Sequence, residues 1–354
     1  MRRWRRTAAG AAALTAVAAL AAGCSSSGSN STASASLTSS LPTNFGAPEK
    51  TTLNVGVVPA MDSAGFFVAL HDGLFAKEGL TINYSPAVSS ETAVTQQLDG
   101  KLDISAGNYV SYINEAALDH APIEVVAEGS VMQQGAQTIF TMPSSKITTL
   151  AGLKGKLVGV NAPGNIDYLL GVSVLQENGV SPTSVDFSKE PIAFPQMGGE
   201  LASGKIAAAI MPEPFASLAE EQEGAVPLAD LNQGATTDFP IEGYVVTKKW
   251  AAQNPNTLKR FLAALEVGQE ISDTDRGAVE TAFEALNGAT NGQVPPTIAA
   301  VIALDTYPIG VDATRIQRVA DVMFQFGLLK KQFNVSSMLM SASAFNFSQF
   351  STSS

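Results

Sequence analysis

Short apolar runs alternate with longer helical patterns along the chain after Thr51. This alternation predicts strand, helix, strand and helix in turn over residues 53–58, 65–78, 80–84 and 91–99. Strands joined by helices of this length are typical of βαβ units, in which the strands form a mostly parallel sheet. The hydrophobic pattern therefore predicts an α/β fold.

The same pattern occurs a second time, about 100 residues further along the chain. Three glycine positions of the first half each have a counterpart in the second half, in the same order: Gly56 and Gly159, Gly79 and Gly179, Gly100 and Gly204. Three matches in one order favour two similar α/β lobes in tandem. The last pair is followed in each case by Lys and a short apolar run, which predicts a turn between a helix and a buried strand. The carboxyl end of such a strand is expected to open toward the space between the lobes.

The pattern changes in the last third of the chain. Residues 243–247 favour β-structure, and helical patterns then predominate over residues 256–271, 276–286 and 312–326. Trp250 is expected to anchor the start of this helical part by packing. Residues 336–354 are Ser-rich without a clear pattern.

The N-terminus has the features of an export signal. A cationic start, MRRWRR, precedes an apolar run too short for a permanent membrane span, so residues 1–23 are predicted to be a signal peptide. The run ends in Leu-Ala-Ala-Gly-Cys, which resembles the lipobox of bacterial lipoproteins and makes Cys24 the predicted lipidation site. Residues 24–49 are predicted to form a lipidated, Ser-rich tether. The alternative is an ordinary signal peptide followed by a chance cysteine.

Composition narrows the classes of function. The 354 residues are 45% hydrophobic and 15% charged, which excludes a disordered chain, and the formal net charge of −11 disfavours nucleic-acid binding. One cysteine excludes intramolecular disulfides and cysteine-ligated metal centres, and two histidines are too few for a three-histidine site. No Ser-His-Asp or zinc-type spacing occurs. The sequence therefore predicts no enzyme, cofactor or metal site.

Four segments carry a resemblance to a known family: residues 59–80, 153–164, 201–214 and 246–263. Together, in this order, they resemble the nitrate/sulfonate/taurine-type substrate-binding proteins of bacterial ABC importers, a family that also includes thiamin-pyrimidine-binding members. The resemblance implies a type II periplasmic-binding-protein-like fold, with two α/β lobes joined by two crossover strands and the ligand enclosed at the cleft.

The resemblance also implies domain limits. Residues 50–140 and 245–340 are expected to form lobe one, residues 143–240 lobe two and residues 341–354 a C-terminal tail, with crossover strands at 140–142 and 244–246. The chain departs from the family pattern at Ala207, where the family usually has Asp; lobe one keeps the counterpart, Asp103. We expect this change to alter a turn rather than the ligand chemistry.

The function implied by the resemblance is that of a monomeric, extracytoplasmic lipoprotein. It captures a small organic molecule and delivers it to an ABC permease and its ATPase at the membrane that holds its lipid anchor. A ligand-sensing lipoprotein that signals to a membrane sensor is an alternative. A pyrimidine synthase-like enzyme of related fold is disfavoured, because that family depends on histidine and a cysteine-rich segment.

Candidate ligand-binding residues follow from the loops at the carboxyl ends of the predicted strands. They are Asp62, Ser63, Gly107, Asn108, Tyr109, Gln134, Asn161, Gly164, Asn165, Asp167, Tyr168, Glu213, Phe215, Glu242 and Tyr244. Asn offers both a donor and an acceptor, Tyr can stack on a ring, and a helix start near Gly164 offers free backbone N–H groups. The alternative for Asp62 and Glu213 is a helix cap.

The charges of these loops predict the charge of the ligand. The loops contain Asp62, Asp167, Glu213 and Glu242, but no Lys or Arg. Carboxylates oppose an anion in a cleft of low dielectric. We therefore expect a neutral or cationic polar ligand, such as a heterocycle stacked on a tyrosine, rather than a sulfonate or nitrate. An anion held by helix-end amides remains the alternative.

Overall fold

The computed structural model describes residues 45–118, 120–286 and 294–340. The predicted signal peptide, the lipidation site Cys24, the tail at 341–354 and most of the tether lie outside the described residues. In the part that is described, no helix is both long enough and apolar enough to span a membrane.

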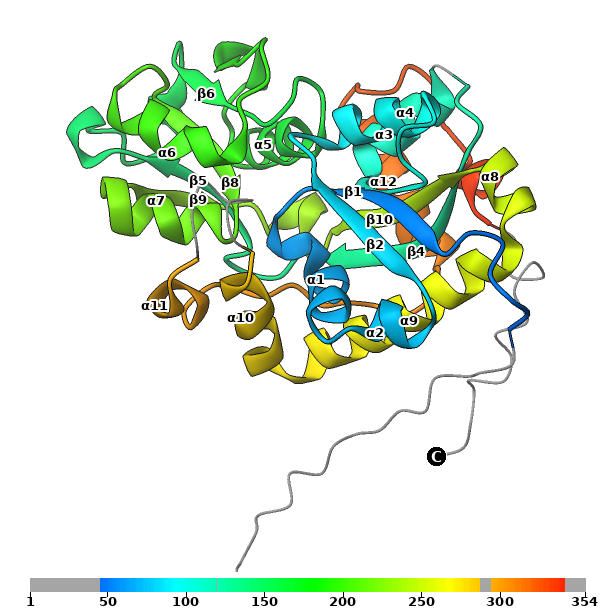
Figure 1. The fold of residues 1–354 in the computed structure, drawn as a ribbon. Helices are drawn as coiled ribbons and strands as arrows, with labels where there is room; N and C mark the ends of the chain where they lie inside the picture. Colours follow the sequence, from blue (N-terminus) through cyan, green and yellow to red (C-terminus); the bar gives the residue numbers. More distant parts are fainter. Residues whose placement is uncertain (1–44, 119, 287–293, 341–354) are drawn as a thin grey trace, which may run out of the picture. The chain divides into compact units, whose positions relative to one another are not determined.

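The strands form two five-stranded sheets, each with helices packed against it (Figure 1). The first sheet contains β1 (Thr52–Val57), β2 (Thr81–Pro86), β3 (Ile104–Asn108), β4 (Ile123–Val131) and β10 (Pro240–Thr247). The second contains β5 (Gln137–Thr141), β6 (Leu157–Gly159), β7 (Asp186–Phe187), β8 (Ala208–Pro212) and β9 (Val226–Asp230). We call each sheet with its helices a lobe.

Most helices belong to the first lobe. They are α1 (Ala64–His71), α2 (Leu74–Lys77), α3 (Ser90–Leu98), α4 (Tyr109–Ala117), α8 (Lys248–Gln253), α9 (Pro255–Thr274), α10 (Arg276–Glu284), α11 (Pro296–Ala299) and α12 (Ala313–Gln325). The second lobe has α5 (Ile166–Glu177), α6 (Phe194–Ala202) and α7 (Phe215–Glu223). Short 3₁₀ turns include η1 (Met61–Ser63). The single helix predicted over 65–78 is divided into α1 and α2, because Gly73 adopts the left-handed conformation at φ +66°.

The strand orders confirm the predicted two-lobed α/β fold. They are β2-β1-β3-β10-β4 and β7-β6-β8-β5-β9, so β1, β2 and β3 occupy the same places as β6, β7 and β8. The repeated glycines share more than their spacing: Gly100 and Gly204 have φ values of +77° and +73° and precede β3 and β8. The sequence repeat therefore reflects a repeated structure.

The chain passes between the two sheets at different places from those expected. Phe140 and Thr141 lie inside β5 of the second sheet, and residues 244–246 lie inside β10 of the first. The chain instead leaves the first sheet after Val131 and returns to it at Pro240, over residues 132–136 and 231–239. The residues that the resemblance assigned to crossover strands lie in or directly after buried strands within the sheets, whereas the true connections carry no strand pattern.

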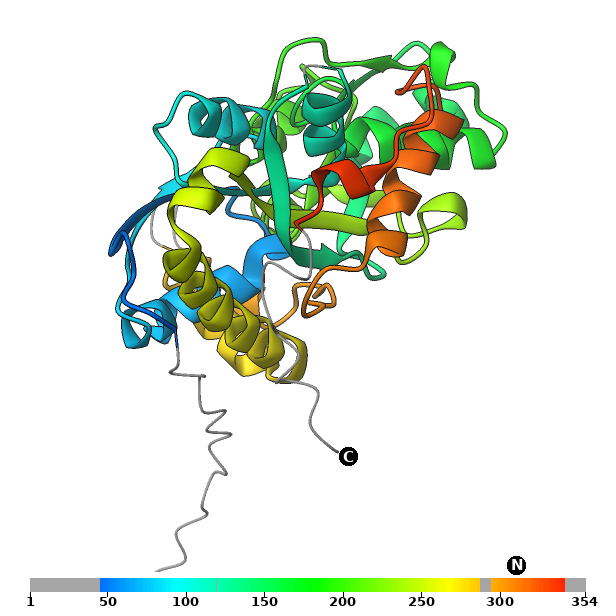
Figure 2. The same cartoon turned by 90° about the vertical axis from the view of Figure 1, so that its right-hand side faces the viewer.

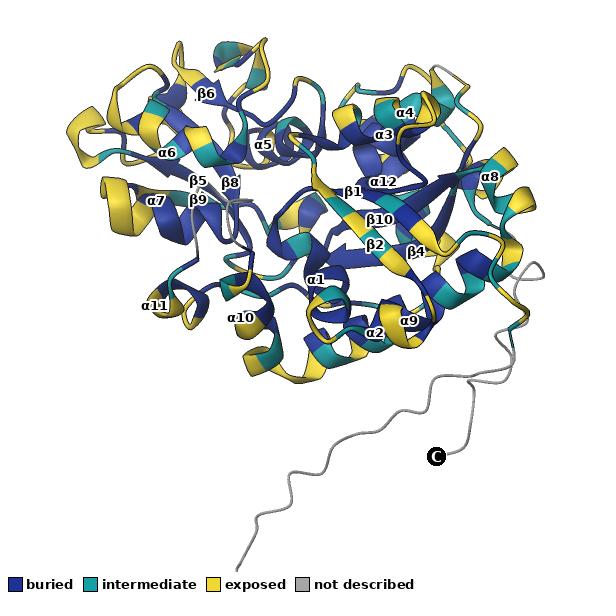
Figure 3. Ribbon diagram, in the orientation of Figure 1, coloured by how far each residue is buried: buried dark blue, intermediate teal, exposed yellow. Residues whose placement is uncertain are grey.

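Helices cover both faces of the first sheet. Alternate residues of β4 and β10 face opposite sides: Val125 and Val245 pack with α12, and Val126 and Val246 pack with α1 and α9. Figure 2 shows α9 and α12 on opposite sides of these strands. The central strands β1, β3 and β10 are buried, while the edge strand β2 is largely exposed (Figure 3).

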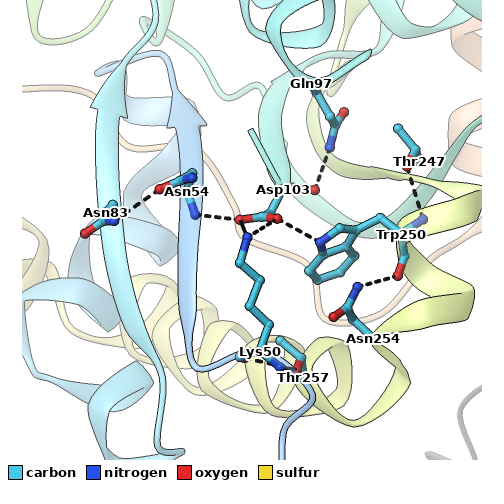
Figure 4. Close-up of polar contacts among 9 residues, drawn as sticks. All are labelled: Lys50, Asn54, Asn83, Gln97, Asp103, Thr247, Trp250, Asn254 and Thr257. Carbon is cyan, nitrogen blue, oxygen red and sulfur yellow. Dashed lines mark hydrogen bonds and ion pairs between the residues drawn. The ribbon is translucent and has the colours of Figure 1, made fainter. Parts of the chain in front are cut away.

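Asp103 joins three parts of the first lobe just before β3 (Figure 4). Its carboxylate forms an ion pair with Lys50 at 2.7 Å and accepts hydrogen bonds from the Asn54 backbone amide and the Trp250 indole, both at 2.8 Å. Trp250 thus anchors α8 by a hydrogen bond as well as by packing. Because Ala207 occupies the matching place before β8, the second lobe has no carboxylate at this position.

The described end of the expected tether is attached to the first lobe. The Glu49 carboxylate accepts hydrogen bonds from the Asn256 and Thr257 backbone amides at the start of α9, where the helix leaves amide groups free. Arg260 donates to the Phe45 and Gly46 carbonyls. Residues 45–49 are therefore part of the lobe rather than of a free tether.

Candidate functional site

The lobes contact each other through the loops that follow their strands. The Met61 amide, after β1, donates to the Glu213 carbonyl, after β8, at 2.8 Å. The Asn161 side chain, after β6, donates to the Val88 carbonyl, after β2, at 2.9 Å. The carboxyl ends of strands from both sheets therefore face the same junction.

A cluster of carboxyl groups lies on the first-lobe side of this junction. The Asp62 carboxyl, in η1, lies within hydrogen-bonding reach of the Asp305 carboxyl, and the Gln137 side-chain amide hydrogen-bonds to it from β5. Ser63 Oγ donates to Glu242 Oε1 at 2.5 Å. Burial raises the pKa of Asp62 to about 6, and burial followed by the charge of Asp62 raises the pKa values of Glu242 and Asp305.

The second lobe contributes Asp167 to the same junction. Asn165 caps α5 by accepting from the Tyr168 amide at 3.4 Å, which places Asp167 in the first turn with 1% of its surface exposed. Asp167 Oδ2 accepts from the Asn161 amide at 2.9 Å. Burial is the main cause that raises the pKa of Asp167 to about 7, and the charges of Asp62 and Glu91 add to it.

Four buried acceptor atoms at the junction lack a hydrogen-bond partner among the described residues. They are Glu91 Oε2, Gln137 Oε1, Asp167 Oδ1 and Asp305 Oδ2. The other carboxylate oxygen of Glu91 accepts from Ser111 Oγ. Buried acceptors without a donor are costly in a protein interior, so this junction has unused capacity to accept hydrogen bonds.

No basic side chain balances these acids within the described part of the chain. None of Asp62, Glu91, Asp167, Glu242 and Asp305 forms an ion pair with a Lys, Arg or His there. We call these five residues the acidic cluster. The nearby Arg315 is paired with Glu128 at 2.8 Å. Over the same described ranges, no group of three or more His, Cys, Asp or Glu side chains is arranged to hold a metal ion.

Several other predicted site residues support the local fold around the cluster. Asn108 caps α4 by accepting from the Ser111 amide at 2.9 Å, and its own amide donates to Ser90 Oγ. Gly107 approaches Ser90 so closely that a Cβ would lie 2.5 Å from Ser90 Oγ. Gly164, at φ +72°, lies in the loop before α5, and its carbonyl accepts from the Asn114 side chain at 3.5 Å.

The predicted aromatic residues do not line the acidic cluster with free ring faces. Tyr109 and Tyr244 are buried within the first lobe, although the Tyr109 hydroxyl has no partner among the described residues. Phe215 stacks on Phe194 in the core of the second lobe. Tyr168 packs against Phe187 and lines a groove formed by second-lobe residues alone. Stacking of a ligand ring on these tyrosines stays a prediction without support from their surroundings.

Two further predicted residues have roles outside the cluster. The Glu213 carboxylate caps α7, accepting from the Ser217 amide at 3.1 Å and from its hydroxyl at 2.8 Å. This is the capping role that the sequence left open for it. Gln134 is exposed in the connection between β4 and β5.

The sequence prediction missed Glu91, Gln137 and Asp305. The sequence places Glu91 only in a helix, and from the candidate loop at 129–137 it singles out Gln134 rather than Gln137, which begins β5. Asp305 lies in the C-terminal part, in a segment that runs beside β4: Thr306 and Val131 exchange backbone hydrogen bonds. Only the return of the chain in three dimensions brings Asp305 to the loops of the first half.

Comparison with family models gives one match, to the NMT1-like family, over residues 46–287. This is more than half of the chain. The protein belongs to the NMT1-like family. A protein of Haemophilus influenzae named for thiamine biosynthesis is 24% identical to this family member over 309 residues, which are 80% of this chain and 90% of the relative.

Solved structures with the same fold include two binding proteins. The alkanesulfonate-binding protein SsuA from Xanthomonas axonopodis pv. citri, bound to MOPS, is 18% identical with a TM-score of 0.68, over 82% of this chain and 98% of that one. The periplasmic nitrate-binding protein NrtA from Synechocystis PCC 6803 is 17% identical with a TM-score of 0.69, over 82% and 86%. At this identity the likeness shows the fold, and it confirms the periplasmic-binding-protein architecture that the sequence predicted.

Proposed function

We propose that this protein is an extracytoplasmic solute-binding lipoprotein. It captures a small polar molecule between its two lobes and delivers it to an ABC permease and its ATPase, while Cys24 carries the lipid anchor. The fold shared with sulfonate- and nitrate-binding proteins supports this role, as does the export signal that the sequence predicts before the described residues. The protein acts as a monomer and as a receptor rather than an enzyme.

The observation that carries the proposal is the acidic cluster at the contact between the lobes. Its unpaired acceptors favour a ligand that donates hydrogen bonds, and its carboxylates favour a neutral or cationic ligand over a strongly anionic one. We place the ligand against Asp62, Asp167 and Glu242. Of the predicted residues, Ser63, Asn108, Asn161 and Asn165 orient these side chains or the loops beside them.

A sulfonate- or nitrate-type anion receptor is the second candidate, favoured by the names of the two structural neighbours. The start of α5 offers it backbone amides, since Gly164 and Asn165 precede the helix. Asp167 in the first turn opposes it, because an anion there would meet a buried carboxylate. A ligand-sensing lipoprotein differs from both only in its partner, a membrane sensor.

A thermal-shift panel of amines, pyrimidines, flavin-like rings, alkanesulfonates and nitrate tests the proposal. A ligand at 100 times its dissociation constant adds roughly 2.7 kcal/mol to the free energy of unfolding. We expect stabilisation by a neutral or cationic compound. Stabilisation by a sulfonate or nitrate alone would favour the anion receptor, and the absence of any shift in a broad metabolite panel would count against a receptor.

A further inference from the structure

The carboxylates of the acidic cluster come from both lobes. Asp62 and Glu91 belong to the first lobe and Asp167 to the second, and the charges of the first two act on the third. In the described arrangement the lobes are in contact beside them, through Met61 with Glu213 and Asn161 with Val88. The contact therefore brings like charges from opposite lobes together in a buried place.

The hydrogen bonds around these carboxylates offset this only in part. The Asp167 carboxylate accepts a hydrogen bond from the Asn161 backbone amide, and Glu91 accepts one from the Ser111 hydroxyl. Asp62 accepts one from the Gln137 side-chain amide. Only 1% of the surface of Asp167 is exposed, yet its Oδ1 atom has no hydrogen-bond donor within the described residues. The same is true of Gln137 Oε1. What the junction lacks is positive charge and N–H groups.

We propose that an organic cation with N–H donors completes this junction, and that its positive charge is what permits the lobes to close. Without ligand, repulsion between Asp167 and the pair Asp62 and Glu91 keeps the lobes apart. A bound cation turns this repulsion into attraction on both sides. The inference rests on the proposed receptor function and adds to it the class of ligand and the reason for closure.

Closure then depends on the charge of the ligand and not only on its shape. A ligand shifts a conformational equilibrium only by its differential affinity for the two states. A neutral compound of the same shape leaves the repulsion in place, so it has little preference for the closed state. The site therefore discriminates between an amidinium or ammonium compound and its uncharged amide analogue.

A single metal ion fits the junction poorly. Metal sites need several ligand atoms that converge on one point, and no group of three or more ligating side chains does so within the residues described. Organic cations need only separate acceptors in a region of negative charge, which is what Glu91, Gln137 and Asp167 provide.

The ligand-free protein allows a test that requires no knowledge of the ligand. Fluorescent labels at two exposed positions, Ala76→Cys in the first lobe and Gln222→Cys in the second, report the distance between the lobes in a Cys24→Ser background. We expect Asp167→Asn to raise the ratio of closed to open molecules roughly tenfold or more at pH 8, as one unit of pKa corresponds to a factor of ten. Asp186→Asn, the same change at an exposed position of the second lobe, is the matched control and should change nothing.

The wild-type protein provides a second measurement that does not depend on a variant. Lowering the pH from 8 to 5 protonates Asp167 and Asp62 in the closed state. The other acidic groups that face these two carboxyls are Glu91, Glu242 and Asp305. Because protonation removes the repulsion between the lobes, we expect the ligand-free lobes to close at pH 5. The proposal that repulsion between carboxylates keeps the ligand-free lobes open would be overturned by either of two results. One is an Asp167→Asn protein as open as the Asp186→Asn control, and the other is wild-type lobes that stay equally open at pH 5.

Matched ligand pairs test the class of ligand. In a panel of aryl and alkyl amidines with their amides, we expect the amidinium members to close the lobes at concentrations at least tenfold lower than the amides. Closure by Zn²⁺ or Mg²⁺ alone, or by amides as readily as amidines, would overturn the organic cation. If no compound binds while Asp167→Asn still closes the ligand-free protein, the repulsion between the lobes is supported and the receptor proposal fails.

Discussion

Asp167 lies in the first turn of α5 with one oxygen bonded to the Asn161 amide and the other without a partner among the described residues. A carboxylate is ordinarily stabilised at a helix N-terminus, yet burial raises the pKa of this one to about 7. Desolvation therefore outweighs the helix dipole here. The charged form of Asp167 is therefore destabilised in the ligand-free protein, and a bound cation would stabilise it.

The raised pKa of Asp167 predicts how the free energy of unfolding of the ligand-free protein varies with pH. The folded-state pKa of about 7 lies above the ordinary value of 3.8, so stability from this group is fully present below pH 4 and is lost as the pH rises through 7. From pH 5 to pH 8 the free energy of unfolding should fall, and Asp167 accounts for at most about 2 kcal/mol of this fall, because opening of the lobes relieves the burial of its carboxylate. Urea denaturation at both pH values measures it.

Asp167→Asn should remove that part of the pH dependence, while Asp186→Asn should keep it. Asp62, with a pKa of about 6, and Glu242 and Asp305, whose pKa values burial also raises, contribute further losses that remain in both variants. Equal pH dependence in Asp167→Asn and wild type would show that the Asp167 carboxyl is not destabilised by its surroundings.

The residues of the acidic cluster differ in how far the sequence could predict them. Asp62 and Asp167 follow predicted strands, so the rule that ligands lie at the carboxyl ends of strands found them. Glu242 comes directly before the predicted strand at 243–247, and it reaches the same edge because β10 runs antiparallel to β3, with Glu242 beside Asn108. Asp305 follows no strand of the first sheet. It reaches the cluster because its segment returns to β4 after α9, α10 and α11, a tertiary path that leaves no local pattern.

At the scale of elements, the glycines of the repeat were the most informative part of the sequence. Gly100 and Gly204 predicted equivalent turns because a left-handed residue between a helix and a strand nearly requires glycine. The passages between the sheets were misplaced by one strand. β5 and β10 are apolar because helices or loops bury both their faces, and that composition does not distinguish a strand within a sheet from one that crosses between sheets.

The bonds of Asp103 predict a large effect on the stability of the first lobe. The buried carboxylate joins the start of β1, the start of β3 and α8 through Lys50, Asn54 and Trp250. Asp103→Ala leaves the indole and the Asn54 amide without their acceptor, so we expect a loss of about 2–4 kcal/mol in the free energy of unfolding. Guanidinium denaturation monitored by Trp250 fluorescence measures it.

Two variants show whether the indole and amide bonds or the ion pair dominate. Lys50→Met removes only a partly exposed cation and should cost less than about 1 kcal/mol. Asp99→Asn, in the exposed pair with Lys101, is the control and should cost about 0.5 kcal/mol or less. If Asp103→Ala costs no more than this control, the carboxylate does not hold the three elements together.

At the scale of the whole molecule, the attachment of residues 45–49 affects how a lipid anchor would act. Glu49 and Arg260 fix this segment to the α9 side of the first lobe. A chain held at Cys24 therefore pulls on the first lobe alone. The second lobe is joined to the first through residues 132–136 and 231–239, so in the proposed closure it would move relative to an anchored first lobe.

Cys24→Ser tests the anchor itself. A thioether-linked lipid needs the cysteine sulfur, so the variant should move from the membrane fraction to the soluble or culture-medium fraction, detected by immunoblotting after fractionation. Cells that express the wild-type protein, together with an integral membrane protein as marker, provide the control. A variant that stays in the membrane fraction as firmly as wild type would contradict lipidation at Cys24.

Closure of the lobes predicts a change in the dimensions of the whole protein. The hydrogen bonds that join the lobes at the junction contribute only about 1 kcal/mol each, so we expect a bound ligand to shift the equilibrium toward closure. A saturating ligand from the thermal-shift panel should lower the radius of gyration in small-angle X-ray scattering.

Asn161→Ala removes the hydrogen bond to the Val88 carbonyl and should weaken ligand binding by about tenfold. At the same ligand concentration, the radius of gyration of this variant should fall less than that of the wild-type protein. Because Asn161 also gives its backbone amide to Asp167, a substitution that leaves the backbone intact keeps the acidic cluster in place and isolates the contact between the lobes. An unchanged scattering profile at saturation would exclude the hinge and leave binding to a rigid cleft.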